Sequence, residues 1–155
     1  MERTLVLIKP DGLQRNLIVE VIGRFEKKGL KIIGIKMVSI NDLKVEEHYK
    51  KYTEKPFFKH LKKFMQSAPV IALVLEGIEA ISAVRLITGD TKGREADAGT
   101  IRGDLSMSGQ TNLVHVSDPE ENPPKEIKRF FKDEELFEYK KVDMHYLYSQ
   151  DELEG

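Results

Sequence analysis

Two successive repeats of strand, helix and strand constrain the fold of this chain most strongly. Apolar, β-branched runs alternate with stretches whose apolar residues recur at helical spacing. Strands are expected at Arg3 to Lys9, Leu30 to Ile40, Val70 to Glu76 and Asn112 to Ser117, and helices between Asn16 and Gly29 and over Ile78 to Thr88. This order predicts an α+β, ferredoxin-like split βαβ sandwich, a four-stranded antiparallel sheet with both helices on one face.

Proline and asparagine residues mark several boundaries of these elements. Pro10 ends the first strand, since proline has no N–H for a central ladder, and leaves Lys9 at the strand's C-terminal end. Asn16 is expected to cap the first helix. Asn122 and the two prolines after it predict a further helix, with Glu126 in its first turns.

Two insertions interrupt the repeats. Leu43 to Ser67 is rich in aromatic residues and is expected to form one or two helices, broken at Lys55-Pro56. Gly89 to Thr111 shows no periodicity, yet it holds five of the eleven glycines. A loop of that length in a compact domain is usually functional.

Length and composition limit the class of protein. A chain of 155 residues with 40% hydrophobic residues is expected to form one domain, over 1–155. The net charge of -1 gives no general attraction to a polyanion. There is no cysteine, which excludes disulfides, thiol nucleophiles and cysteine-based zinc sites and indicates a reducing compartment. The first residues match neither a signal peptide nor a membrane span, so we expect a soluble, cytoplasmic protein.

The sequence lacks several common phosphate and metal motifs. It contains no GxxxxGK[ST] loop, and no GxGxxG follows an expected strand. No histidine has a partner histidine four residues later, so we expect no metal held by the protein alone.

His115 has the most suggestive neighbours. It alternates with Val114 and Val116, so if the valines face the core the imidazole points outward on the opposite side. A strand histidine on its own is most often a satisfied polar group, and Glu126 could simply compensate a helix dipole. The alternative is that Glu126, helped by Ser117, binds one ring nitrogen and leaves the other free to attack.

Other positions also have two interpretations. Arg102 stands between two glycines in GTIRGD, which would let the backbone approach a ligand closely. Arg85 lies on the preceding helix and Thr91 just past its end, and singly all three are most often surface residues. Phe57 would be either a core residue or a platform on which a base stacks.

Together these positions form ordered motifs: KPDG, HY followed by KPFF, the arginine of AVRLITGDT, GTIRGD and N-x-x-H-x-S-D. In this combination the chain resembles the nucleoside diphosphate kinase family, without gaps from Arg3 to about Tyr139. The resemblance implies transfer of the γ-phosphate of ATP, or another nucleoside triphosphate, to a nucleoside diphosphate. The transfer would run through a phosphohistidine, in a ping-pong cycle that maintains the triphosphate pools.

The resemblance also implies a role for each site residue. His115 would be the nucleophile, with Glu126 and Ser117 orienting its ring. Phosphate and active-site contacts would come from Lys9, Tyr49, Arg85, Thr91 and Arg102, ribose contacts from Lys9 and Asn112, and base stacking from Phe57. A stacking platform accepts every base, because every base has a π-face.

Cofactor and partners follow from the same resemblance. Mg²⁺ would be held through the nucleotide phosphates, with few protein ligands. The partners would be ATP, nucleoside diphosphates and further copies of the chain, in a hexamer or tetramer built from a common dimer. We expect neither membrane nor nucleic-acid partners.

The sequence departs from the family's usual pattern in three places. Val116 follows the histidine where Gly or Ala is usual, and its extra methyl groups would leave less space beside the nucleophile. Gly109 and Thr111 replace the usual Val and Arg, so the apolar cover opposite the stacking aromatic is missing. Lys92-Gly93 stands where a proline is common and the usual C-terminal Trp is absent, which concerns the oligomer contacts.

Two other functional classes remain open on the residues alone. A non-catalytic nucleotide-binding or interaction module could use the same scaffold, because a fold does not fix a function. Val116 and Gly109 favour that class, whereas a pure binder needs no glutamate-oriented histidine. An RNA-binding sheet is disfavoured by the net charge of -1 and by the lack of an aromatic pair on any expected strand.

Overall fold

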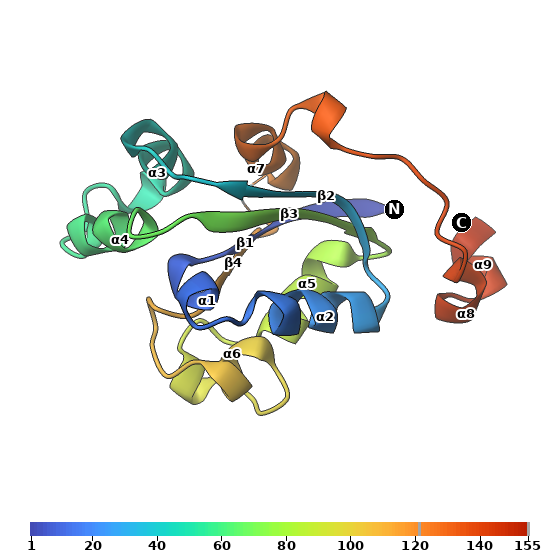
Figure 1. Ribbon diagram of the computed structural model, residues 1–155. Helices are drawn as coiled ribbons and strands as arrows, with labels where there is room; N and C mark the ends of the chain where they lie inside the picture. The colour runs from blue at the N-terminus through green and yellow to red at the C-terminus, as the bar shows by residue number, and fades with distance from the viewer. Residues whose placement is uncertain (121, 155) are drawn as a thin grey trace.

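A four-stranded antiparallel sheet organises the molecule, seen in the computed structural model, which describes residues 1–120 and 122–154 (Figure 1). The strands are β1 (Glu2–Ile8), β2 (Lys31–Val38), β3 (Val70–Gly77) and β4 (Val114–Val116), in the spatial order β2-β3-β1-β4. Helices α2 (Ile18–Lys28) and α5 (Ala80–Thr88) pack together on one face. The predicted split βαβ arrangement is confirmed.

The other face of the sheet is also covered. Helices α3 (Asp42–His48), α4 (Phe58–Met65) and α7 (Pro123–Phe130) lie on it, contributed by the first insertion and the C-terminal part of the chain (Figure 1). Leu5 and Leu7 of β1 pack into this layer, whereas Val6 and Ile8 pack toward α2 and α5. Burial on both faces explains why β1 reads as a nearly continuous apolar run.

The first turn of the chain differs from the prediction. Pro10 does end β1, but it also opens a short helix, α1 (Pro10–Gln14), that the pattern did not indicate. Asn16 does not cap α2: its φ is 58°, and the residue before α2 is Leu17, whose side chain has no hydrogen-bonding group. The predicted asparagine cap is therefore wrong, because Asn16 takes the left-handed conformation that links α1 to α2.

The expected loop from Gly89 to Thr111 is partly helical. It contains η2 (Gly93–Glu95) and α6 (Ile101–Leu105), which are too short to show periodicity. Thr100 caps α6 by accepting the Gly103 N–H at 3.0 Å. A Cβ on Gly103 would lie 1.9 Å from the Asp97 carbonyl oxygen, so only glycine fits there. Ile101 is fully buried beneath the sheet and anchors the loop.

The remaining boundaries are close to those expected. A break around Lys55-Pro56 separates η1 (Lys50–Tyr52) from α4, and the Asn122 side chain caps α7 by accepting the Lys125 N–H. Beyond α7 come η3 (Asp133–Glu135), α8 (Met144–Leu147) and α9 (Gln150–Glu154). Among the residues described, no helix has the length and apolar character to cross a bilayer.

Candidate active site

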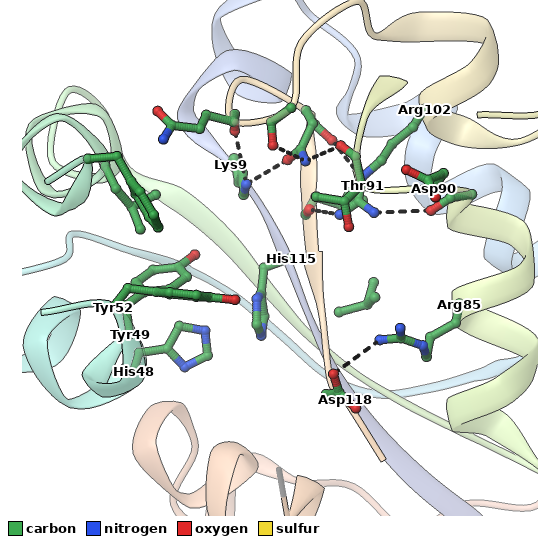
Figure 2. Close-up of a pocket in the computed structure, with 18 of the residues that line it drawn as sticks. Lys9, His48, Tyr49, Tyr52, Arg85, Asp90, Thr91, Arg102, His115 and Asp118 are labelled. Carbon is green, nitrogen blue, oxygen red and sulfur yellow. Dashed lines mark hydrogen bonds and ion pairs between the residues drawn. The ribbon is translucent and has the colours of Figure 1, made fainter. Parts of the chain in front are cut away.

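A cavity of about 460 Å³ lies beside β4, a volume typical of small-molecule sites (Figure 2). One wall comes from α3 and the segment after it, and the other from the end of α5 and the 89–111 segment. Most of the predicted site residues line it: Lys9, Tyr49, Phe57, Arg85, Thr91, Arg102, Asn112 and His115. Ser117 and Glu126 are not among the lining residues.

The position of His115 follows from the register of β4. It pairs with Leu7 of β1, which places the imidazole on the face covered by α3 and α7, whereas Val116 pairs with Val6 on the other face. The expected opposition of histidine and valines is correct. The ring does not point into open solvent, however, because its side chain is only 17% exposed and faces the cavity. Val116 packs against the core cluster on that other face, and it also lines the cavity together with His115.

Glu126 contacts the imidazole on its buried side. Its Oε1 lies 3.1 Å from His115 Nε2, and the carboxylate is 1% exposed. Burial, and after it the charge of Lys9, lower the pKa of His115 to about 3, so the ring is neutral near pH 7. A neutral ring that donates its Nε2 proton to Glu126 carries its lone pair on Nδ1.

Ser117 takes a different position from the one expected. Its hydroxyl accepts the Leu5 N–H at 3.1 Å and lies 3.5 Å from the Leu5 carbonyl oxygen. Among the described residues, Oε2 of Glu126 has no hydrogen-bond partner. Ser117 therefore ties β4 to β1 in this structure and does not bind the Glu126 carboxylate.

His48, which sequence reasoning did not single out, packs against the nucleophile candidate. Its ring meets that of His115 edge to face, and its Nδ1 lies 3.8 Å from Glu126 Oε1. Burial holds the pKa of His48 well below its usual value. Both of its nitrogens are buried without a hydrogen-bond partner in the described parts of the chain. Its only sequence signal was its place directly before Tyr49.

Lys9 and Arg102 bring positive charge to the ring of His115. The Lys9 ammonium donates to Asn112 Oδ1 at 2.6 Å and to the Gln110 carbonyl at 3.1 Å. Burial first, and then the charge of Arg102, lower the pKa of Lys9 to about 7. This ammonium is therefore poised between its two protonation states near neutral pH.

The Arg102 guanidinium is held in place by three backbone carbonyls. It donates to Asn112 at 3.2 Å, Gly89 at 3.1 Å and Val114 at 2.7 Å. Burial is the main reason that the pKa of Arg102 falls to about 10, a value that leaves the group charged at neutral pH. Within the described residues, this leaves two of its five N–H groups for a ligand.

The outer part of the cavity is aromatic and more exposed. Phe57 is 37% exposed and forms a tilted ring pair with Tyr52 at 5.5 Å, so it is a rim residue and not part of the core. Tyr49 is buried, donates to the Met65 sulfur at 3.7 Å, and has its pKa raised by burial. Arg85 lies 3.9 Å from an oxygen of Asp118.

Among the residues that the structure describes, one group of side chains has the spacing of metal ligands. The ligand atoms of His48, His115 and Glu126 lie within 4.8 Å of one another. Positive charge from Lys9, Arg102, Lys51 and Arg129 reaches the two rings, and this disfavours a dication held by a single carboxylate. Mg²⁺ prefers oxygen ligands and commonly binds through phosphates. The cavity offers it the carboxylates of Asp90 and Asp118, together with cations for the phosphates, so the lining fits a magnesium nucleotide.

Comparison with known proteins agrees with this geometry. Residues 2–136 match the family model described as nucleoside diphosphate kinase. A nucleoside diphosphate kinase of Parabacteroides distasonis is 51% identical, over 99% of this chain and 100% of its own length, and one of Staphylothermus marinus is 54% identical, over 89% and 98%. The structure of the Halobacterium salinarum enzyme in complex with CDP superposes with a TM-score of 0.93 at 42% identity, covering 96% of this chain and 99% of the other. The chain therefore belongs to the nucleoside diphosphate kinase family.

Proposed function

We propose that this chain takes the γ-phosphoryl group of ATP, or of another nucleoside triphosphate, onto Nδ1 of His115 and passes it to a nucleoside diphosphate. The observation that carries the proposal is the contact between Glu126 and His115 Nε2, which leaves the lone pair on Nδ1 of a ring that also feels the positive charges of Lys9 and Arg102. The family relationship supports the same reaction.

The reaction balances without an external base. The lone pair on Nδ1 forms a bond to the γ-phosphorus while the bond to the bridging oxygen breaks, and the nucleoside diphosphate leaves. The phosphorylated ring keeps its Nε2 proton and becomes cationic, and the Glu126 carboxylate stabilises that charge. In the second half, a terminal oxygen of the acceptor diphosphate attacks the phosphorus and neutral His115 is restored.

The cations would stabilise the charge that spreads over the equatorial phosphate oxygens during transfer. Arg102 would contribute its two remaining N–H groups, and Lys9 would bind while protonated. Arg85 and Thr91 would bind phosphate farther out, Asn112 and Lys9 the ribose, and Phe57 the base. Phosphate-bound Mg²⁺ would neutralise part of the phosphate charge, with Asp90 and Asp118 as the carboxylates able to reach it.

We further propose that the chain forms a homo-oligomer in the cytoplasm. β2 is an edge strand of the sheet, and its Ile35 and Met37 are more than half exposed, which favours a contact with another copy. The absence of cysteine agrees with a reducing compartment. Light scattering of the purified chain tests the assembly, since a monomer at micromolar concentration would contradict it.

Labelling with γ-phosphate-labelled ATP and Mg²⁺ tests the chemistry. The wild type should retain acid-labile phosphate on His115 and release it to any nucleoside diphosphate. His115→Ala should lose both label and turnover, whereas the control His60→Ala, which changes an exposed histidine outside the cavity, should keep both. A wild type that turns over without label would contradict the phosphohistidine. A binding module without activity would show neither.

A further inference from the structure

A strained turn lies directly before the strand that carries His115. The Val114 N–H donates to the Asn112 carbonyl at 2.9 Å, closing a three-residue γ-turn with Leu113 at its centre. Leu113 has a φ of 72°, a region that leucine rarely occupies. The γ-turn with positive φ is rare and strained. Such a conformation persists only where surrounding contacts impose it.

Two groups from the KPDG segment hold this turn. The Leu113 N–H donates to Asp11 Oδ2 at 3.0 Å, and the Leu113 carbonyl accepts the Lys9 N–H at 2.8 Å. Asp11 is 8% exposed, and its other oxygen has no partner within the described residues. The leucine side chain is fully buried against the α2 and α5 layer. The turn is thus fixed at its N–H, its carbonyl and its side chain.

The residues on either side of Leu113 bind two cations of the cavity, Lys9 and Arg102, and lead directly to His115. The side chain of Asn112 accepts the Lys9 ammonium, and its carbonyl accepts Arg102. The Val114 carbonyl accepts Arg102 as well, and His115 is the next residue. Any change in the turn would therefore move His115, Lys9 and Arg102 relative to one another.

We propose that Asp11 is a positioning residue for phosphoryl transfer, whose carboxylate holds the γ-turn at Leu113 and thereby aligns His115 with Lys9 and Arg102. The inference rests on the proposed function. Asp11 does not line the cavity, so it acts through the turn and not on the nucleotide. A merely structural carboxylate would affect stability and leave turnover per active site unchanged.

Two variants separate the hydrogen bond from the shape of the side chain. Asp11→Asn keeps an oxygen acceptor for the Leu113 N–H, whereas Asp11→Leu keeps the approximate shape and removes the acceptor. Asp104→Leu is the matched control, because Asp104 also accepts a backbone N–H, from Gly99 at 2.7 Å, and does not line the cavity. If Asp11→Leu yields no folded protein, Asp11→Ala replaces it.

The measurement is kcat per phosphorylatable His115, from titration with labelled ATP, at a temperature where circular dichroism shows every variant folded. We expect Asp11→Leu to lose about 30-fold or more, since a 1 Å misplacement can cost about 100-fold. Asp11→Asn should stay within about threefold and Asp104→Leu within about twofold of wild type. The ¹⁵N resonance of His115 Nε2 should shift only in the leucine variant.

The inference would be overturned if Asp11→Leu kept the wild-type kcat per active site. It would also be overturned if Asp11→Asn and Asp11→Leu lost kcat by the same factor. Neither result touches the proposed function, because the wild type is labelled in both. A wild type that takes up no label would instead overturn the proposed function.

Discussion

The rings of His48 and His115 meet edge to face with their centroids 4.2 Å apart and an interplanar angle of 73°. Burial is the main cause that lowers the pKa of each histidine, to about 3 for His115. Both neutral imidazoles lie beside one buried carboxylate, Glu126, which is within hydrogen-bond distance of His115 at 3.1 Å and lies 3.8 Å from His48. The arrangement keeps His115 uncharged, and it also makes the folded state sensitive to acid.

We predict that stability falls as the pH drops below about 6.5. The unfolded chain binds a proton at each histidine near pH 6.5, whereas the folded rings bind one only at much lower pH, so acid favours unfolding. Each ring contributes a slope of about 1.4 kcal/mol per pH unit within this window. Urea unfolding between pH 7.5 and 4 measures it. His48→Phe should reduce the slope by one proton, and an unchanged slope would contradict the prediction.

The pKa of Lys9 predicts how kcat/KM changes on the basic side of its pH profile. Because the free site holds that pKa at about 7, the ammonium loses its charge as the pH rises through that value. Phosphate binding then weakens, so kcat/KM, which reports the free enzyme, should fall above about pH 7. Lys9→Arg keeps the charge and should move this limb upward by about two pH units or more. Steady-state assays from pH 6 to 9.5 test it, and identical limbs in both proteins would exclude Lys9 as the titrating group.

The three carbonyl contacts of Arg102 predict a large loss on truncation. Arg102→Ala should lower kcat about 100-fold, the size typical of removing one donor to developing charge. Arg102→Lys keeps a charge but cannot reach three carbonyls at once, so it should fall in between. Arg94→Ala is the control, because Arg94 is an exposed arginine of the same segment and does not line the cavity. A kcat close to wild type in Arg102→Ala would show that the guanidinium does not reach the phosphates.

Gly109 predicts a gain of affinity. Among the described residues, a Cβ at this position would meet the Lys92 Cγ alone, at 3.6 Å, which is ordinary van der Waals contact. Gly109→Val should lower the KM for nucleoside diphosphates about fivefold, because covering an apolar base contributes about 1 kcal/mol. The gain should be similar for purines and pyrimidines. An unchanged or higher KM would show that the nucleotide base does not bind next to position 109.

The sequence predicted those parts of the site that local signals determine. Asn122 and its prolines place the start of α7, and hence Glu126, and the alternation of Val114 and Val116 places His115 on the other side of the strand. Contacts between distant segments could not be predicted in this way. Asp11 and Leu113 are 102 residues apart, and only the register of β1 with β4 brings them together.

The errors have equally local physical reasons. Asn16 has the composition of a helix cap but takes a left-handed backbone conformation, which its side chain tolerates. Ser117 lies close to His115 in sequence, yet its hydroxyl accepts the backbone N–H of Leu5 and does not reach Glu126. Helices as short as α6 carry too few turns to show a period.

The cavity draws its walls from both coverings of the sheet: His48 and Phe57 from one side, Arg85 and Arg102 from the other. A nucleotide bound across it would add contacts between the two layers on either side of the sheet. At 100 times its dissociation constant it would add about 2.7 kcal/mol to the free energy of unfolding. The concentration of nucleotide in the cell would thus affect the thermal stability of the fold, so the substrate would also protect the protein against heat.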